Sequence, residues 1–260
     1  MPESNAANAV DAGDTADDHV KPFVYETLNS KALHFSLSEI QSRMHIDRPF
    51  ALDLEYTGLM MGFLLFNSAP AELAMIGLGG GSLAKYCHRY LPSSHIQVVE
   101  INPHVIALRE RFEVPADDAR FRVLRGDGAE FVRAPPHLLD VLMVDGFDYS
   151  GTPPALCSQA FYDDCLACLK PNGLLVVNLH RGHRDYDIHV GRLYNTFGEE
   201  VLVVGGTDSS NGIVFACRGP LLQQLKMSVL RRPKAFDQAA WDDLKPSLGM
   251  VRATLRAQNP

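Results

Sequence analysis

The sequence predicts an α/β protein: a doubly wound, mostly parallel, seven-stranded Rossmann-like sheet preceded by a small antiparallel β region. Two observations indicate this class. Short apolar segments alternate with helix-like segments from Leu73 onward, and a glycine-rich turn follows the first of them. Alternating strands and helices imply a parallel sheet covered on both faces. The 260 residues, 46% of them apolar, are enough for one large domain with appendages.

The first 56 residues differ in pattern from the rest of the chain. Residues 1–20 contain Glu3, Asp11, Asp14, Asp17 and Asp18 with no Lys or Arg and no apolar periodicity, which predicts a disordered acidic tail. Residues 21–56 contain short alternating segments that predict a small antiparallel sheet packed on the large domain. The expected strands are Phe23–Thr27, Leu33–Leu37 and Phe50–Leu54.

Residues 57–217 are expected to form the Rossmann-like, nucleoside-binding catalytic domain, and residues 218–260 a helical extension. The last two strands could form an antiparallel edge hairpin, and Lys170–Gly173 is expected to stop a helix and turn the chain. In the extension, Pro220, Pro233 and Pro246 are expected to join separate helices. The expected strands are Leu73–Leu78, Ile96–Ile101, Phe121–Arg125, Val141–Asp145, Leu174–Leu179, Val201–Val204 and Ile213–Ala216, with helices over Ser82–Tyr90, Pro103–Phe112 and Gln159–Leu169.

Charge and composition disfavour several classes of partner. The net charge is −7, but five negative charges lie in the tail, so the rest is nearly neutral and no strongly basic face for nucleic acid is evident. The apolar run Leu59–Phe66 is far shorter than the roughly 20 residues that cross a bilayer. It is expected to be a buried helix or a subunit interface. Five scattered cysteines and an acidic N-terminus without a signal-like start predict a cytoplasmic protein with reduced thiols.

The residues that end the first four strands of the large sheet carry the functional prediction. Ligands of doubly wound sheets bind beyond the carboxyl ends of the strands. The first strand ends in a glycine loop that opens a helix, and the next three end at Glu100, Asp127 and Asp145. Singly, these could be a tight turn, a solvated strand end or a helix cap, but together they predict a nucleoside site. The glycine loop comprises Gly77, Gly79, Gly80 and Gly81, followed by Ser82.

The identity of the nucleoside follows from the two later acids. A dinucleotide fingerprint can be placed on Gly79–Ala84. Asp127 and Asp145, however, are better explained by an adenosine that carries a sulfonium tail. The pattern resembles the S-adenosylmethionine-dependent methyltransferase fold and, within it, the spermidine synthase family of aminopropyltransferases. The resemblance covers roughly residues 50–180 and rests on Ile76–Gly81, Val99–Pro103, Gly126–Gly128, Asp140–Asp148, Phe161–Tyr162 and Leu169–Leu174.

This resemblance implies a role for each residue of the site. Decarboxylated S-adenosylmethionine, or S-adenosylmethionine itself, would be the co-substrate, and no metal is needed. The glycine loop and Ser82 would lie along the tail of the donor, and Asp145 would be the catalytic carboxylate. Binding roles would fall to Glu100 and Ile101 for the ribose, Asp127 and Gly128 for the adenine, and Asp148, Tyr149 and Tyr56 for the amine. By the same resemblance, a homodimer is expected.

Transfer of a group to an amine requires a base, and this requirement predicts a carboxylate independently of the resemblance. An alkylamine has a pKa near 10 and is mostly protonated at neutral pH. It must lose a proton before it attacks the methylene next to a sulfonium, and Asp145 at a strand end is suited to accept it, directly or through water. Holding both substrates in line supplies much of the remaining acceleration.

Two departures from the family pattern concern the donor tail and the amine. Ser82 stands where the family normally has an aspartate that anchors the donor's amino group. The family has a Tyr-His-Glu-like sequence that helps to hold the amine. Its tyrosine is present here as Tyr56, but Thr57 and Gly58 stand in place of the histidine and the glutamate. The sequence therefore predicts an aminopropyltransferase with a polyamine or other amine as its acceptor, and with altered amine recognition.

Two alternatives stay open. One is a methyltransferase that uses intact S-adenosylmethionine, which the neutral Ser82 would suit. The other is a nucleoside-binding homologue without activity. Two candidate metal sites are disfavoured: Cys165 and Cys168 fit a buried helix face, and His180, His183 and His189 fit a polar loop near the pocket.

Overall fold

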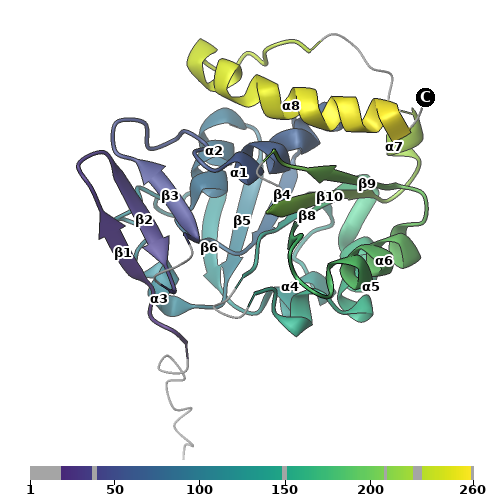
Figure 1. The fold of residues 1–260 in the computed structure, drawn as a ribbon, viewed down its shortest axis with the longest axis horizontal. Helices are drawn as coiled ribbons and strands as arrows, with labels where there is room; N and C mark the ends of the chain where they lie inside the picture. The colour runs from purple at the N-terminus through teal and green to yellow at the C-terminus, as the bar shows by residue number, and fades with distance from the viewer. Residues whose placement is uncertain (1–18, 37–39, 148–150, 208–209, 225–229, 259–260) are drawn as a thin grey trace, which may run out of the picture.

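The computed structural model describes residues 19–36, 40–147, 151–207, 210–224 and 230–258. Its main feature is a seven-stranded sheet of order β6-β5-β4-β7-β8-β10-β9 (Figure 1). Neighbouring strands from β6 to β8 are parallel, whereas β10 is antiparallel to β8 and β9. The fold class and the edge hairpin are therefore confirmed. The strands are β4 (Glu72–Ile76), β5 (His95–Glu100), β6 (Phe121–Arg125), β7 (Leu139–Val144), β8 (Leu169–His180), β9 (Val201–Gly205) and β10 (Asn211–Cys217).

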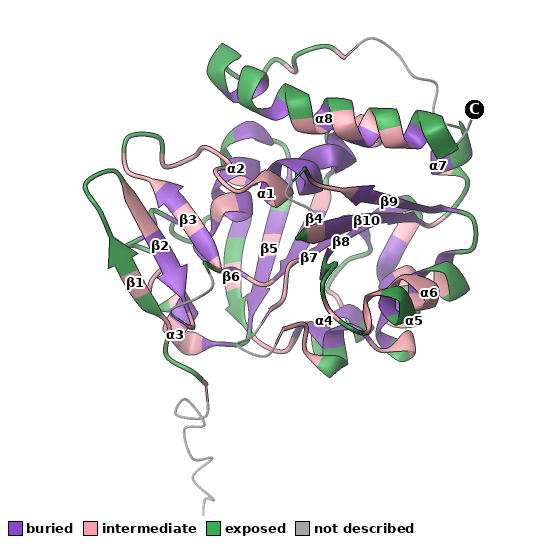
Figure 2. Cartoon of the chain, viewed as in Figure 1, coloured by how far each residue is buried: buried purple, intermediate pink, exposed green. Residues whose placement is uncertain are grey.

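Helices cover both faces of this sheet because its strands alternate between two apolar cores. Leu73 and Met75 of β4 point into one core, and Ala74 and Ile76 point into the other. The strands other than the edge strand β6 are therefore buried along most of their length, while α8 exposes its outer side (Figure 2). The first core is covered by α1 (Glu55–Met60), η2 (Met61–Leu65), α2 (Ser82–Tyr90) and α8 (Gln238–Gln258), and the second by α4 (Gly128–Arg133), α5 (Gln159–Cys168) and α6 (Tyr186–Phe197).

A three-stranded antiparallel sheet precedes the large domain, as expected, but its second strand begins three residues earlier than predicted and ends at His34, and its third strand lies elsewhere. Its strands are β1 (Phe23–Glu26), β2 (Ser30–His34) and β3 (Ser42–His45). The segment 50–54 is irregular instead, because the carboxylate of Asp53 forms ion pairs with Arg43 and with His45 (2.6 Å) and so holds this segment beside β3. The predicted tail, residues 1–20, lies outside the described residues except for His19 and Val20.

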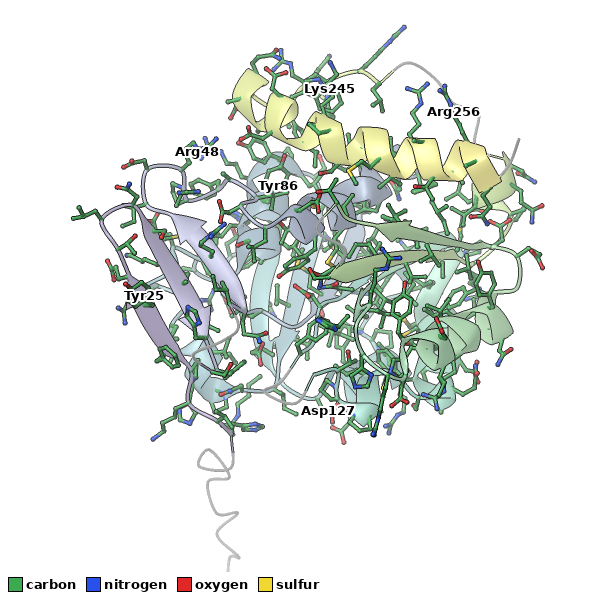
Figure 3. The ribbon with its side chains drawn as sticks, in the orientation of Figure 1. Tyr25, Arg48, Tyr86, Asp127, Lys245 and Arg256 are labelled. Carbon is green, nitrogen blue, oxygen red and sulfur yellow. The ribbon has the colours of Figure 1, made fainter. Side chains whose placement is uncertain are left out.

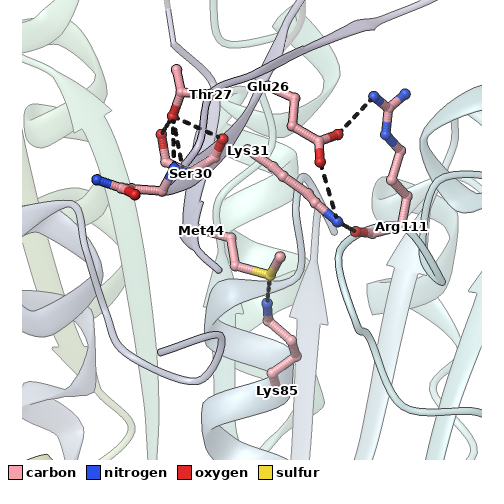
Figure 4. A network of polar contacts seen from close by, with 8 residues as sticks. Glu26, Thr27, Ser30, Lys31, Met44, Lys85 and Arg111 are labelled. Carbon is pink, nitrogen blue, oxygen red and sulfur yellow. Dashed lines mark hydrogen bonds and ion pairs between the residues drawn. The ribbon is translucent and has the colours of Figure 1, made fainter. Parts of the chain in front are cut away.

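Buried and surface contacts join the small sheet to the large domain (Figure 4). The Lys85 ammonium of α2 donates to Met44 Sδ of β3 at 3.0 Å and to the Phe112 carbonyl at 2.7 Å. Burial lowers the pKa of Lys85 to about 8, so the group is still mostly protonated at neutral pH. On the surface, Arg111 pairs with Glu26 of β1 at 3.1 Å. The small sheet is thus held against α2 and the chain after α3 (Pro103–Ile106).

Two further predictions within the domain are corrected. The helix expected over Pro103–Phe112 ends at Ile106, because the next turns close with tighter bonds, such as Leu108 N–H to Val105 C=O. Helix α5 does stop at Cys168, but β8 begins at the very next residue, so Lys170–Gly173 lie within a strand. A register shift between β7 and β8 accommodates them. By contrast, the apolar run Leu59–Phe66 is the expected buried helical segment, formed by α1 and η2.

The C-terminal extension also differs, because Pro246 does not separate two helices. It lies inside α8, which continues from Gln238 to Gln258. The helix persists because one of its sides is buried against α1, η2 and β9, and this packing outweighs the hydrogen bond that proline cannot donate. The buried residues of α8 are Ala240, Trp241, Leu244, Leu248, Val251 and Leu255.

We predict that Pro246→Ala stabilises the protein. Pro246 is exposed, and an interior proline costs a helix about 3 kcal/mol relative to alanine, whereas proline restricts the unfolded chain by about 1 kcal/mol. The free energy of unfolding should therefore rise by roughly 2 kcal/mol in urea denaturation. Pro233→Ala, outside the helices, is the matched control and should give no gain. A lower stability for Pro246→Ala would contradict this account of α8.

Candidate active site

A cavity of about 620 Å³ lies at the carboxyl edge of β5, β4 and β7. Nine of the predicted site residues line it together, drawn from four strand ends and from α1. Gly80 and Gly81 lie in the same loop but not in the lining, and Asp148 and Tyr149 lie outside the described residues. The nine are Tyr56, Gly77, Gly79, Ser82, Glu100, Ile101, Asp127, Gly128 and Asp145.

The glycine loop owes its shape to positive φ angles and to one close backbone approach. Gly77, Gly79 and Gly81 have φ of +94°, +52° and +69°, a region that disfavours residues with a Cβ. A Cβ on Gly77 would collide with the carbonyl of Asp145. This approach sets the loop after β4 directly beside the end of β7.

Glu100 is buried beneath this loop and braces it. Its Oε2 accepts from the Leu78 N–H at 2.9 Å, and its Oε1 accepts from the Asn102 N–H at 2.8 Å. Burial raises the pKa of Glu100, and these two backbone bonds act in the opposite direction. Each carboxylate oxygen has a second lone pair, so the group can still accept hydrogen bonds from a ligand.

Asp127 caps a helix at the adjacent strand end. Its Oδ1 accepts from the Ala129 N–H at 2.6 Å, at the start of α4. Figure 3 shows Asp127 at the lower edge of the molecule, next to α4. The helix-cap interpretation of this residue is therefore correct, but capping occupies one oxygen only, and the side chain still lines the cavity.

Asp145 follows β7 and is held by two side chains. The Tyr56 hydroxyl donates to its Oδ2 at 3.2 Å, and the Asn178 amide donates to its Oδ1 at 2.9 Å. Removal from bulk water raises the pKa of Asp145, while both hydrogen bonds favour its ionised form. The pKa of Tyr56 is raised as well, chiefly by burial and also by the neighbouring carboxylate. Tyr56 is therefore a neutral donor to the carboxylate of Asp145.

Comparison with known proteins identifies the family. The model of the spermine/spermidine synthase domain matches residues 54–183. A polyamine aminopropyltransferase from Neisseria meningitidis serogroup A is 35% identical over 91% of this chain and 89% of its own length. Another, from Chromobacterium violaceum, is 38% identical over 77% of this chain and 78% of its own length.

The chain belongs to the spermine/spermidine synthase family. Solved structures agree with this at the level of the fold. A probable spermidine synthase from Corynebacterium glutamicum has a TM-score of 0.66 at 17% identity, covering 92% of this chain and 91% of that one. Human methyltransferase-like protein 13 in complex with SAH has a TM-score of 0.55 at 25% identity, covering 78% and 90%.

Sequence reasoning missed several residues of this family member's cavity. Asn178 is buried at the end of β8, and its position after an apolar strand was a usable signal, because a buried polar residue requires a partner. Asn211 and Gln41 also line the cavity. So do His19 and Val20, and the Val20 carbonyl accepts from Asn102 Nδ2 at 2.9 Å. The segment before β1 thus forms part of the wall near Glu100.

The cysteines and histidines considered above as metal ligands have other contacts in the structure. Cys165 and Cys168 are free and buried in the core under α5. His183 stacks on His189 with ring centroids 5.9 Å apart, and His180 lines the cavity. Within the described part of the chain, no group of three or more His, Cys, Asp or Glu side chains could hold a metal ion.

We predict that Gly77→Ala damages the site far more than Gly79→Ala does. Alanine at position 77 combines an unfavourable φ with a collision against the Asp145 backbone, whereas a Cβ at position 79 meets only Ser42 Cβ at 3.7 Å. The expected losses in unfolding free energy are roughly 3–5 kcal/mol and about 1 kcal/mol. Thermal or urea denaturation measures both. Equal losses would contradict the close approach of the two strand ends.

Proposed function

We propose that the protein transfers an aminopropyl group from decarboxylated S-adenosylmethionine to an amine and releases methylthioadenosine. The observation that carries this proposal is the position of the Asp145 carboxylate. Tyr56 and Asn178 bind it beside the glycine loop, in the lining of the cavity. Membership of the spermine/spermidine synthase family supports the same reaction, because the relatives of this chain are named polyamine aminopropyltransferases.

The donor would occupy the half of the cavity nearest β4, β5 and α4. Glu100, with Ile101 beside it, would accept the ribose hydroxyls, and Asp127 with Gly128 would bind the adenine. The glycine loop and Ser82 would lie along the aminopropyl tail. The carboxylates of the lining, Glu100, Asp127 and Asp145, favour a cationic sulfonium donor over an anionic one.

The reaction would proceed by direct displacement. The ammonium of the acceptor first gives one proton to Asp145, directly or through water. The neutral amine nitrogen then attacks the methylene next to the sulfonium, a C–N bond forms, and the C–S bond breaks with its electron pair going to sulfur. Methylthioadenosine leaves as a neutral thioether, and the product amine carries the positive charge. The raised pKa of Asp145 makes it a better base than an exposed aspartate. Alignment of the two substrates supplies most of the remaining acceleration.

The acceptor would be an amine whose far end is bound differently from that of the usual diamine. The described lining away from the nucleoside side is formed by Phe35, Ile40, Gln41 and His180, without a second carboxylate among these residues. Thr57 and Gly58 replace the family's His and Glu, and Asp148 and Tyr149 are the remaining candidates for contact with the amine. These features favour an acceptor with an apolar or neutral distal end.

One observation favours methyl transfer as a second candidate. Human methyltransferase-like protein 13, in complex with SAH, has the same fold at 25% identity. The neutral Ser82 would not repel the carboxylate of an intact S-adenosylmethionine. Both donors should therefore be tested in parallel.

The assembly and location are proposed with the function. We propose a homodimer in the cytoplasm. Tyr25 and Leu28, at the edge of the small sheet, are 63% and 95% exposed and supply apolar surface for a second copy; Tyr25 projects outward in Figure 3.

The five cysteines are free and buried, which suits a reducing compartment. Among the described helices, none is long and apolar enough to cross a membrane.

The first prediction from this proposal concerns the products. Purified protein is incubated with decarboxylated S-adenosylmethionine and a panel of mono-, di- and polyamines, with intact S-adenosylmethionine in parallel, and products are measured by mass spectrometry. Methylthioadenosine should form only when an amine is present, and the amine product identifies the acceptor. S-adenosylhomocysteine would instead assign the protein to the methyltransferases. Binding of either donor without any product would indicate a nucleoside-binding homologue.

The second prediction concerns Asp145. Asp145→Asn keeps the shape of the side chain but removes the base, so turnover should fall by roughly 10²–10⁴-fold. Binding of methylthioadenosine, measured by calorimetry, should survive. Asp164→Asn makes the same chemical change on the half-buried outer side of α5, where Asp164 pairs with Arg133 at 3.6 Å away from the cavity, and is the matched control. Unchanged turnover in Asp145→Asn would rule out its role as the base.

A further inference from the structure

Asp145 is the end point of a chain of hydrogen bonds that crosses the sheet. Ser210 Oγ donates to Asn211 Oδ1 at 2.9 Å, and Asn211 Nδ2 donates to Asn178 Oδ1 at 2.8 Å. Asn178 Nδ2 then donates to Asp145 Oδ1 at 2.9 Å. All three distances lie within the normal range for hydrogen bonds. The chain therefore connects the loop before β10 with the carboxylate at the end of β7.

We propose that Asn178, with its amide orientation fixed by Asn211, is the positioning residue that keeps the Asp145 carboxylate ionised and aimed into the cavity. This inference rests on the proposed function only where it concerns turnover. The effect of Asn178 on Asp145 can be measured in the protein without any substrate.

The two ends of an asparagine side chain differ in their hydrogen bonding. An amide presents a donor at one end and an acceptor at the other, so a reversed Asn178 would place a carbonyl oxygen against Asp145 and repel its negative charge. Asn211 prevents the reversal, because its Nδ2 requires an acceptor at that position. Ser210 in turn donates to Asn211 Oδ1 and so sets the orientation of Asn211. Each member of the chain thus determines the direction of the next.

The strand register places the two asparagines together. Asn178 is paired in register with Ile213 of the antiparallel strand β10, so Asn211, two residues before Ile213, is its diagonal neighbour on the same face. Asn178 is 3% exposed, and it follows Leu174 and Val176 on the face that is covered by α1 and α8. A buried amide in such a place is costly unless both of its ends are bonded, and here both are.

The other groups around Asp145 do not replace this contact. Tyr56 of α1 donates to Oδ2, the opposite oxygen of the carboxylate. His180 lies at the end of β8, while Glu100 at the end of β5 and Asp127 before α4 lie across the cavity and disfavour a further negative charge. Asn178 is therefore the donor that holds Oδ1 of the carboxylate.

The experiment measures the ionisation of Asp145 directly. The ¹³Cγ signals of aspartate are followed against pH by NMR in the intact protein, and Asp145→Asn identifies the signal of Asp145. In Asn178→Ala the pKa of Asp145 should rise by about 1, because a hydrogen bond to the charged form is lost. Asn211→Ala leaves Asn178 able to donate and should give a smaller rise. Asn195→Ala, on the exposed side of α6, is the matched control and should give none.

A double-variant cycle separates orientation from charge. In Asn211→Asp the new carboxylate accepts from Asn178 Nδ2, which turns the carbonyl of Asn178 toward Asp145 and raises the pKa of Asp145. The added negative charge contributes by itself, and its share is measured in the background of Asn178→Ala, where no amide can turn. A larger rise when Asn178 is present supports the orientation role. Equal rises in the two backgrounds would overturn it.

Activity measurements then separate the two proposals. If aminopropyl transfer is the function, the acidic limb of the kcat profile of Asn178→Ala should move to higher pH, because more of the base is protonated at a given pH. The KM for the donor should stay unchanged. An unchanged pKa of Asp145 in Asn178→Ala, with methylthioadenosine binding and thermal stability confirming a folded protein, overturns the positioning role. A raised pKa in a protein whose wild type forms no methylthioadenosine supports that role and contradicts the proposed function instead.

Discussion

The structure of the site depends on the contact between the backbones of Gly77 and Asp145. The parallel pairing of β4 with β7 sets Ile76 opposite Val144, and the Asp145 N–H donates to the Ile76 carbonyl at 2.9 Å. The residue after Ile76 must then pass so close to the Asp145 carbonyl that a Cβ does not fit. Glycine at this point brings the loop that follows β4 and the carboxylate that follows β7 into one cavity. A bulkier residue would separate the proposed donor site from the proposed base.

Three carboxylates lie at the same edge of the sheet, and they are stabilised by two different kinds of hydrogen-bond donor. Glu100 is buried and Asp127 is part-buried, and backbone N–H groups of the adjoining turns bind both. Asp145 depends instead on the side chains of Tyr56 and Asn178. Burial raises the pKa of Glu100 and of Asp145, yet each carboxylate has donors that favour its charged form. A cationic ligand would lessen the mutual repulsion of the three groups, which agrees with the cationic donor proposed for this cavity.

The sequence predicted the parts of the molecule that follow from topology. Gly77, Glu100, Asp127 and Asp145 each lie at the end of a strand or just after it, and the ends of parallel strands must meet at one edge. Asn178 and Asn211 could not be paired in advance, because their contact depends on the register between β8 and β10, which apolar runs do not specify. The third strand of the small sheet was misplaced because 50–54 is richer in apolar residues than 42–45, where Met44 alone is apolar. The contacts of Asp53 with Arg43 and His45 instead hold 50–54 beside β3 as an irregular segment. The effect of Pro246 was predicted wrongly because helix propensity describes a residue and its neighbours in sequence. The packing that keeps α8 continuous comes from parts of the chain that are distant in sequence.

The different supports of the three carboxylates bear on how this site could accept an unusual amine. A carboxylate that is held by backbone N–H groups cannot be altered without reshaping its loop, so the half of the cavity proposed for the nucleoside is constrained by the fold itself. A carboxylate that is held by side chains can be retuned by a single substitution in α1 or β8. The proposed amine half is also lined by Phe35, just after β2, and by Gln41, just before β3, so part of it lies outside the doubly wound core. The proposed change in acceptor recognition is therefore compatible with the proposed donor site, because different parts of the chain line the two sides.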